Sequence, residues 1–245
     1  DARPAVSLQT VRDFATLANG VGLTNEQIHA QFPDAYLVYN TETEMQYMAV
    51  HDDHLGQVLA IRGTRDLENV CTDLHFNTGD DGYSKGFHNL ALTLLADTKL
   101  WGDDNTAGFF DPSKPLQITG HSMGAAIAVL IGLIFDGTLP TNDQSTPLSY
   151  TVQAIVNFGQ PKVGEEQVAD AIHGLPLLRV VDNHDFVPLL PPSSFDFIHA
   201  SPQLLLRVDD SPSYQAVNVS DISANLFTLL IDHKLSLDDH YMTSY

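Results

Sequence analysis

The sequence is poor in three features that would assign a protein to a particular class: cysteine, basic residues and long apolar runs. The single cysteine, Cys71, excludes an intrachain disulfide and a zinc site built on several thiolates. Only 11 lysines and arginines stand against 31 acidic residues, which disfavours contact with the phosphate backbone of a nucleic acid. No run reaches the ~18 apolar residues of a membrane span, so we expect no stable membrane insertion.

The formal net charge of −20 has two interpretations. It keeps the protein soluble through self-repulsion, or it reflects adaptation to high salt, where screening relieves that repulsion. A calcium-binding function would also suit an acidic chain, but the sequence lacks a D-x-D-x-D-G loop. The length of 245 residues fits one domain over residues 1–245 with a core of its own.

Hydrophobic periodicity changes along the chain. The first part predicts helices and then strands, and from residue 116 onward strands and helices alternate. That alternation predicts an α/β fold with a mostly parallel central sheet and helices on both faces. The expected helices are 8–17, 24–32, 87–100, 125–135, 165–172 and 222–231, and the expected strands are 35–39, 45–50, 57–61, 116–119, 152–158, 177–181 and 204–208.

The segment Gly120-His121-Ser122-Met123-Gly124 has the Gly-x-Ser-x-Gly pattern of a nucleophile elbow. A strand-like segment precedes it and an apolar helical segment follows. In such an elbow the serine lies on a strained strand-to-helix turn with its hydroxyl displayed, and the glycines avoid collisions with neighbouring backbone. The pattern therefore predicts that Ser122 is a nucleophile.

A serine hydroxyl needs a histidine base, and the base needs a carboxylate that orients it. In this architecture the acid and then the histidine follow the serine in the chain. Asp185 lies in a loop after a predicted strand, where a functional carboxylate is well displayed, and Asp182 at the strand end is its rival.

Five histidines follow the predicted nucleophile, and two of them are candidates for the base. His240 comes just after the last predicted helix, and His233 precedes it by seven residues. His199 comes before a predicted strand and is interpreted as a structural hydrogen-bonding residue. Spacing alone does not decide between His233 and His240.

Several sequence blocks, read together, resemble those of the class 3 lipases, the filamentous-fungal triacylglycerol lipases and their bacterial and plant relatives in the α/β-hydrolase superfamily. The blocks occur in the family's order between residues 61 and 241 and are specific as a set. They are Ile61-Arg62-Gly63-Thr64 with Asn69 and Asp73-Leu74, Tyr83-Ser84-Lys85-Gly86-Phe87, Gly120 to Gly124, Asn157 to Gly164, Asn183 to Pro188, and Asp239-His240-Tyr241.

The resemblance implies a role for each matching position. It makes Ser122 the nucleophile, Asp185 the orienting acid and His240 the base. It also implies an oxyanion hole made by the backbone N–H groups of Thr64 and Met123, each such donor being worth about 3–4 kcal/mol. No metal or organic cofactor is required by this chemistry.

Four positions depart from the usual family pattern: Ser84, Val70, Lys162 and His184. None of them is a proposed catalytic group. Together with the absence of the fungal disulfides, they indicate a bacterial or divergent member of the family.

The expected function is hydrolysis of acylglycerols or similar lipid esters through an acyl-enzyme, with a small-molecule or lipid ester as substrate and transient contact with a lipid–water interface. Phospholipase A1 and feruloyl esterase are alternatives within the same chemistry. A non-catalytic lipid-binding or signalling protein is an alternative of another class, but the intact set Ser122, Asp185 and His240 argues against it. The compartment stays open, with secretion favoured. The chain begins at Asp1 rather than Met, which indicates a removed upstream segment whose nature the sequence does not show, and Asn218-Val219-Ser220 is a single match to a glycosylation sequon.

Two segments are candidates for lipid contact. The segment Arg65 to Cys71 occupies the place of the lid in fungal relatives but carries few apolar residues. The loop with Leu100, Trp101, Phe109 and Phe110 is the second candidate, and the favoured interpretation of it is a surface loop pinned by its own aromatic side chains.

Overall fold

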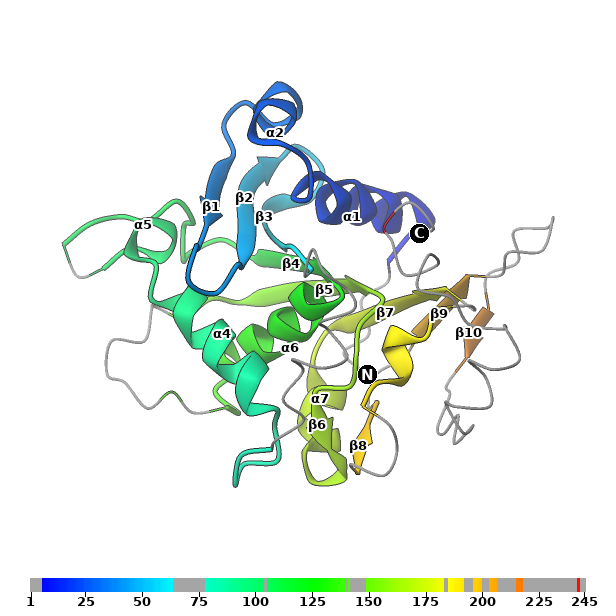
Figure 1. Cartoon of the computed structure of the whole chain (residues 1–245). Coiled ribbons are helices and arrows are strands. Elements are labelled where there is room, and N and C mark those ends of the chain that lie inside the picture. Colours follow the sequence, from blue (N-terminus) through cyan, green and yellow to red (C-terminus); the bar gives the residue numbers. More distant parts are fainter. Residues whose placement is uncertain are drawn as a thin grey trace.

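The computed structural model describes residues 6–63, 78–103, 105–139, 141, 149–182, 185–191, 196–199, 203–206, 215–217 and 242. Its central feature is an eight-stranded sheet in the order β1-β2-β3-β4-β5-β7-β9-β10 (Figure 1). The strands are β1 (Tyr36–Tyr39), β2 (Gln46–Asp52), β3 (Gly56–Ile61), β4 (Leu116–His121), β5 (Val152–Phe158), β7 (Leu177–Asp182), β9 (Gln203–Leu206) and β10 (Gln215–Val217).

The middle of this sheet is parallel and its margins are antiparallel. The pairs β3–β4, β4–β5, β5–β7 and β7–β9 are parallel, whereas β1–β2, β2–β3 and β9–β10 are antiparallel. The carboxyl ends of the five parallel strands therefore open at one edge of the sheet. In open α/β sheets this is the edge where ligands bind.

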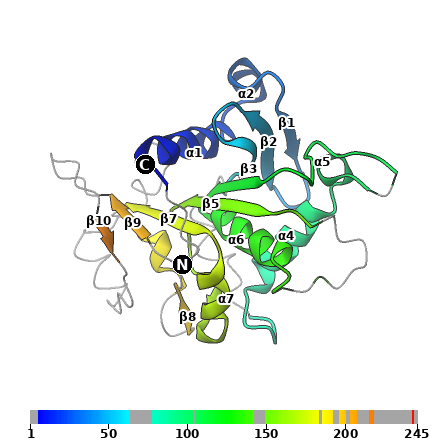
Figure 2. The ribbon, with the colours of Figure 1, turned by 180° about the vertical axis from the view of Figure 1, so that it is seen from behind.

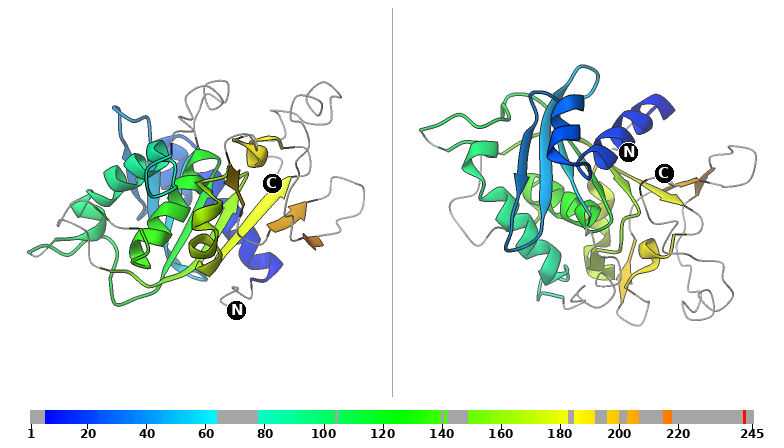
Figure 3. Two further views of the ribbon diagram at one scale, coloured as in Figure 1. Left: turned by 90° about the horizontal axis from the view of Figure 1, so that it is seen from below. Right: turned by 45° about the horizontal axis from the view of Figure 1, so that its top comes forward.

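Helices cover both faces of the sheet, as the sequence predicts. Helix α1 (Leu8–Gly20) packs against β3, β4 and β5 on one face, and helices α4 (Lys85–Leu95) and α6 (Met123–Phe135) pack together on the other (Figures 1 and 2). Helix α7 (Ala169–Gly174) contacts α6. The view from below and the view with the top tilted forward show the same layering, with the sheet between α1 and the α4–α6 pair (Figure 3).

The two faces of the sheet carry separate hydrophobic cores because side chains alternate along each strand. In β3, Leu59 and Ile61 join the core on the α6 face, while Val58 and Ala60 join the core on the α1 face. Strand β3 is therefore apolar on both sides, which explains its uninterrupted apolar run from Val58 to Ile61.

Helix α6 is buried from Gly124 to Phe135. A helix that is apolar all round belongs inside the protein, and this one lies between the sheet and α4. Gly132 allows its close approach, because a Cβ at that position would lie 2.6 Å from Cδ1 of Ile155 on β5. The predicted strand and helix around the elbow are thus confirmed.

Helix α2 (Asn25–Gln31) begins where the sequence predicts a helix start. The hydroxyl of Thr24 accepts the Gln27 N–H, and the Gln27 side chain accepts the Thr24 N–H. This reciprocal capping box satisfies two donors that the first turn would otherwise leave unpaired.

The predicted single helix 87–100 is wrong: the chain forms α4 and then a separate short helix α5 (Thr98–Trp101). The break occurs because the carboxylate of Asp97 accepts the N–H groups of Lys99 and Leu100 and so starts a new helix.

The predicted helix 165–172 is also modified. It begins as a short strand β6 (Gly164–Glu165), which pairs with β8 (Phe197–Ile198), and continues through a 3₁₀ turn η1 (Glu166–Val168) into α7. Neither β8 nor β10 is predicted from the sequence. The predicted helix 222–231 and the lid candidate Arg65 to Cys71 lie outside the described residues. Among the helices that the structure describes, none has the length and apolar character needed to cross a membrane.

Candidate active site

Ser122 lies at the junction of β4 and α6, at the edge where the parallel strands end. Its backbone has φ 55° and ψ −124°, a region that residues other than glycine rarely adopt. Such strain persists only where the surrounding structure holds it, and it is frequent at functional sites. The predicted strand-to-helix elbow with Ser122 at its tip is confirmed.

Two glycines make this elbow possible through close backbone contact. A Cβ on Gly120 would lie 2.4 Å from the Gly124 backbone, and a Cβ on Gly124 would lie 2.2 Å from the carbonyl oxygen of Ile61. Any side chain at either position would push α6 away from the ends of β3 and β4. The glycines therefore fix how Ser122 is presented.

Ser122 is fully buried, with 0% of its surface exposed. Within the part of the chain that the structure describes, its Oγ has no hydrogen-bond partner. Its backbone N–H donates to the Phe158 carbonyl (3.0 Å), and its own carbonyl accepts the N–H groups of Ala125 and Ala126. The backbone of the elbow is thus anchored.

Met123 is the first residue of the 13-residue helix α6. The N-terminus of a helix carries a partial positive charge and favours an anion nearby. Gly63 lies directly beside the elbow, because a Cβ at Gly63 would be 2.9 Å from both Cβ of Ser122 and the carbonyl oxygen of His121. The end of β3 and the start of α6 therefore meet at Ser122.

Asp185 follows β7 at the same edge of the sheet. Its carboxylate is buried (3% exposed), and its Oδ1 accepts the N–H of Val187 (2.8 Å). One strand, β5, separates β7 from the Ser122 strand β4. At ~4.8 Å per strand, the two strand ends lie ~10 Å apart, a gap that a group such as an imidazole can bridge.

The neighbouring acid, Asp182, is also buried (1% exposed) and is the last residue of β7. Its carbonyl accepts the N–H of Asp185 (3.2 Å). Both predicted candidates for the acid are therefore buried, and this hydrogen bond holds Asp185 next to the end of β7.

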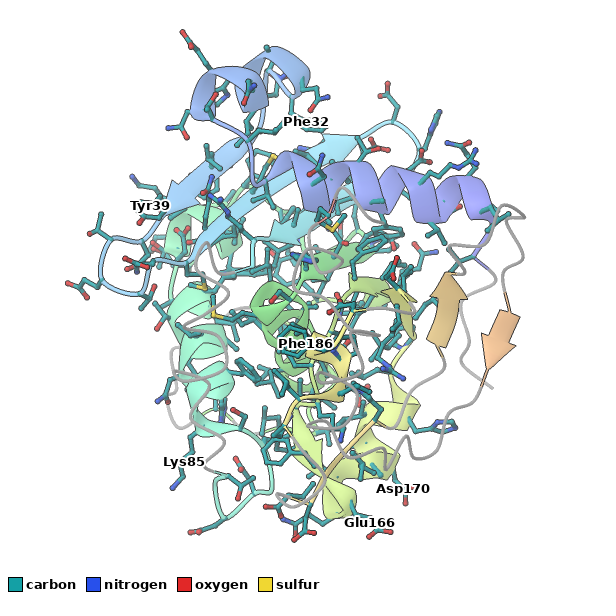
Figure 4. The ribbon with its side chains drawn as sticks, turned by 45° about the vertical axis from the view of Figure 1, so that its right-hand side comes forward. Phe32, Tyr39, Lys85, Glu166, Asp170 and Phe186 are labelled. Carbon is teal, nitrogen blue, oxygen red and sulfur yellow. The ribbon has the colours of Figure 1, made fainter. Side chains whose placement is uncertain are left out.

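Phe186, the residue after Asp185, is labelled near the centre of Figure 4, whereas Lys85, Glu166 and Asp170 lie at the margin of the molecule. The 3₁₀ turn η2 (Val187–Leu189) follows. Phe186, Val187 and Leu190 are buried, so this segment packs against the rest of the protein.

Two predicted site residues, Thr64 and His240, lie outside the described residues, as does the competing base His233. Of the remaining histidines after Ser122, His184 is also outside them, and His173 is exposed on α7. His199 is partly buried, with its Nε2 2.6 Å from the Pro188 carbonyl oxygen. The structure therefore describes Ser122, Met123 and Asp185 at one edge of the sheet.

Two buried polar side chains behind the elbow were not predicted from the sequence. Asn157 on β5 donates from Nδ2 to the Ala125 carbonyl on α6 (2.8 Å) and to Oε1 of Gln160 (2.9 Å). Arg179 pairs in register with Asn157 and is 1% exposed, and its burial lowers the pKa of its guanidinium to about 9. A charged residue inside the apolar run Leu177–Asp182 was the signal that could have identified it.

The segment with Leu100, Trp101, Phe109 and Phe110 is held by its own aromatic side chains, as its favoured interpretation expects. Trp101 and Phe110 are each 1% exposed, and the Tyr150 hydroxyl donates to the carbonyls of both residues. The side chain of Gln57, at the start of β3, donates to the carbonyl of Asp111 in this loop. The loop therefore lies at the opposite end of the parallel strands from Ser122.

No group of three or more histidine, cysteine, aspartate or glutamate side chains in the described ranges is arranged to hold a metal ion.

Comparison with known proteins supports one family. The model of the class 3 lipases matches residues 58–195. A lipase of Rhizomucor miehei is 26% identical over 240 residues, covering 86% of this chain and 61% of the relative. The secreted mono- and diacylglycerol lipase A of Penicillium cyclopium is 29% identical over 199 residues, covering 78% of this chain and 58% of the relative.

The chain thus spans about three fifths of the length of these curated relatives. Among solved structures, lipase II from Rhizopus niveus superposes with a TM-score of 0.68 at 19% identity, covering 97% of this chain and 96% of that one. This likeness shows that the fold is that of an α/β-hydrolase.

Proposed function

The chain belongs to the class 3 lipases, and from that membership we propose that it hydrolyses carboxylic esters of acylglycerols through an acyl-serine intermediate. The observation that carries the proposal is the conformation of Ser122, a non-glycine residue at φ 55° between a parallel strand and a buried helix. A turn with no chemical task has no need of this conformation, because glycine adopts it without strain.

In the proposed reaction the imidazole of His240 takes the proton of Ser122 as Oγ bonds to the ester carbonyl carbon. The carbonyl oxygen becomes an oxyanion, stabilised by the N–H groups of Thr64 and Met123. The bond to the alcohol oxygen then breaks, and the alcohol leaves with the proton of the imidazolium. Water, deprotonated by the same imidazole, attacks the acyl-serine and releases the fatty acid while the proton returns to Oγ.

Two features of the described residues support these roles. Gly63 abuts Ser122, and Thr64 is the next residue in the chain, so the backbone leading to the proposed donor starts beside the nucleophile. Asp185 follows the second parallel strand from Ser122, at a separation that suits an imidazole between the two groups. The assignments of Thr64 and His240 rest on the family resemblance.

We propose acylglycerols at a lipid–water interface as the substrate. The relatives are named lipase and mono- and diacylglycerol lipase, and those from Penicillium are named as secreted, which supports action outside the cell.

The test compares the wild-type chain with Ser122→Ala and with a control, Ser149→Ala. Ser149 is an exposed serine that precedes β5. We expect Ser122→Ala to lose turnover of short-chain p-nitrophenyl esters by about 10⁶-fold, the size seen when a catalytic serine is removed. Ser149→Ala should keep full turnover, and circular dichroism should show that both variants fold. Full activity in Ser122→Ala would overturn the proposed nucleophile.

The substrate class is tested with triglycerides, phospholipids and monomeric esters below and above their solubility limits. A rise in rate for triglycerides above the limit supports the interface. If the rate is highest for phospholipids, the substrate is a phospholipid and not an acylglycerol. If the rate does not change at the solubility limit, the substrate is a soluble ester.

A further inference from the structure

The segment 185–191 carries the Asp185 carboxylate and is held by a small ribbon that does not belong to the main sheet. The ribbon consists of β6 and β8, which pair antiparallel through Gly164 with Ile198 and Glu165 with Phe197. Lys162 lies just before the first strand, and His199 comes directly after the second. Each of these two side chains contacts the segment after Asp185.

The orientation of the Asp185 carboxylate depends on the turn that follows it. Oδ1 accepts the N–H of Val187 (2.8 Å), which is the first residue of the 3₁₀ turn η2. The N–H groups of Leu189 and Leu190 donate to the carbonyls of Phe186 and Val187 (2.9 Å each). A shift of this turn would therefore move the donor that orients the carboxylate.

His199 holds the middle of the turn. Its Nε2 lies 2.6 Å from the carbonyl oxygen of Pro188, and because a carbonyl only accepts, Nε2 must carry the hydrogen. Burial, followed by the positive charge of Arg179, holds the pKa of His199 well below its usual value, although the bond to Pro188 opposes the shift. At neutral pH the side chain is therefore a neutral donor in a fixed tautomer.

Lys162 holds the end of the same segment through two bonds. Its backbone N–H donates to the carbonyl of Leu190 (2.8 Å), and Nζ donates to the carbonyl of Pro191 (3.2 Å). Lys162 follows β5, the strand between the Ser122 strand and the Asp185 strand. The ribbon thus ties the Asp185 segment to the middle of the sheet.

We propose that His199 is a positioning residue that sets the orientation of the Asp185 carboxylate through the Pro188 carbonyl, with Lys162 as its support. The proposal rests on the proposed function, in which that carboxylate orients the catalytic imidazole. His199 itself touches neither the substrate nor the reacting atoms. Displacement of a catalytic group by about 1 Å costs up to ~10²-fold in rate, so a contact at this distance from the chemistry can still control turnover.

The experiment measures kcat, KM and the pH profile on a soluble p-nitrophenyl ester for His199→Leu and His199→Gln. Leucine fills the space without a donor, whereas the amide of glutamine places an N–H near the position of Nε2. We expect kcat to fall by about 10- to 100-fold in His199→Leu with KM within about threefold of wild type. His199→Gln should recover most of that loss. His29→Gln, on the exposed surface of α2, is the matched control and should behave as wild type.

The pH profile separates positioning from a structural role. A carboxylate beside the imidazole raises the pKa of the imidazole, so a misplaced Asp185 should move the acidic limb of kcat to lower pH by about 0.5–1 unit. If His199 only stabilises the fold, its replacement would lower the melting temperature and leave the acidic limb of the kcat profile in place. Wild-type kcat in His199→Leu, or a loss without movement of the limb, would overturn the proposal.

Lys162→Met provides a second test if His199→Leu does not fold. It keeps the apolar stem and the backbone bond but removes Nζ from the Pro191 carbonyl, so a smaller loss of about twofold to fivefold with the same direction of pH shift is expected. An unmoved acidic limb in this variant would contradict the proposal. If Ser122→Ala loses activity while His199→Leu and Lys162→Met both behave as wild type, only this inference is rejected. If Ser122→Ala stays active, the proposed function itself is rejected.

Discussion

Gly63 and Ser122 are packed so tightly that a Cβ at position 63 would lie 2.9 Å from Cβ of Ser122. The contact joins the end of β3 to the tip of the elbow between β4 and α6. Thr64, the proposed oxyanion-hole donor, is the next residue in the chain.

Gly63→Ala tests this contact. The new methyl group must displace the Ser122 side chain or the His121 carbonyl, both of which are 2.9 Å from it. We expect kcat to fall by about 10- to 100-fold and the free energy of unfolding to fall by about 1–3 kcal/mol. Kinetics on a soluble ester and urea unfolding measure the two effects.

Gly86→Ala is the matched control, since no atom lies within 4 Å of a Cβ in the first turn of α4. It should keep full activity and equal or exceed wild-type stability, because alanine favours a helix over glycine by up to about 1 kcal/mol. Equal kinetics for the two variants would show that the Gly63 contact has no catalytic importance.

The assignment of the base is tested by comparing His240→Ala with His233→Ala. Removal of a catalytic histidine costs about as much as removal of the nucleophile, so His240→Ala should lose about 10⁶-fold in kcat. His233→Ala should stay within about tenfold of wild type, as expected for a histidine outside the reaction. The reverse order would transfer the role of base to His233.

The carboxylate of Asp97 gives the fold a predictable response to alkaline pH. The hydroxyls of Tyr36 and Tyr47 donate to its Oδ2 (3.0 and 2.7 Å). Burial, with the hydrogen bond and charge of Asp97, raises the pKa of Tyr36 to about 12 and raises that of Tyr47 as well.

Both tyrosines ionise near pH ~10 in the unfolded chain. Because their pKa values are higher in the folded protein, their contribution to stability is complete below about pH 10 and is lost as the pH rises toward 12. Urea unfolding at about pH 9 and about pH 11 should show the fall, and Tyr36→Phe/Tyr47→Phe should show a smaller one. An equal fall in the double variant would contradict this explanation.

The net charge of −20 predicts a dependence on salt. If self-repulsion destabilises the fold, molar sodium chloride should raise the free energy of unfolding relative to low salt, because the Debye length shrinks from about 10 Å at 0.1 M to about 3 Å at 1 M. A variant with the exposed acids Asp34, Glu42 and Asp53 changed to their amides should be more stable at low salt and less responsive to added salt. Stability that ignores salt in the wild-type chain would rule out salt adaptation.

Local patterns made the elbow and most of the strands predictable. The run Gly120 to Gly124 identifies a strand-to-helix turn because only glycine fits the close backbone approaches on either side of Ser122. The break at Asp97 was not predicted, because the leucines before and after it keep a helical spacing, and only the capping bonds to Lys99 and Leu100 reveal the second helix.

The ribbon of β6 and β8 could not be predicted, since its two strands are two residues each and more than thirty positions apart. Short strands carry no periodicity, so their pairing depends on the tertiary contacts of the chain around them. The contacts of His199 and Lys162 with the segment 185–191 depend on that pairing, so the sequence did not predict them. The sequence predicted only that His199 makes a structural hydrogen bond.

The sequence by itself determined the α/β class, the elbow at Ser122 and the family, because these depend on residue types at short fixed spacings. Only the tertiary structure decided that Gly63 abuts Ser122, that Asp185 lies two strands from it at the same edge, and that the aromatic loop lies at the other end of the strands. The physical reason is that strand order and register are set by packing between distant segments, and no local pattern records which strands become neighbours.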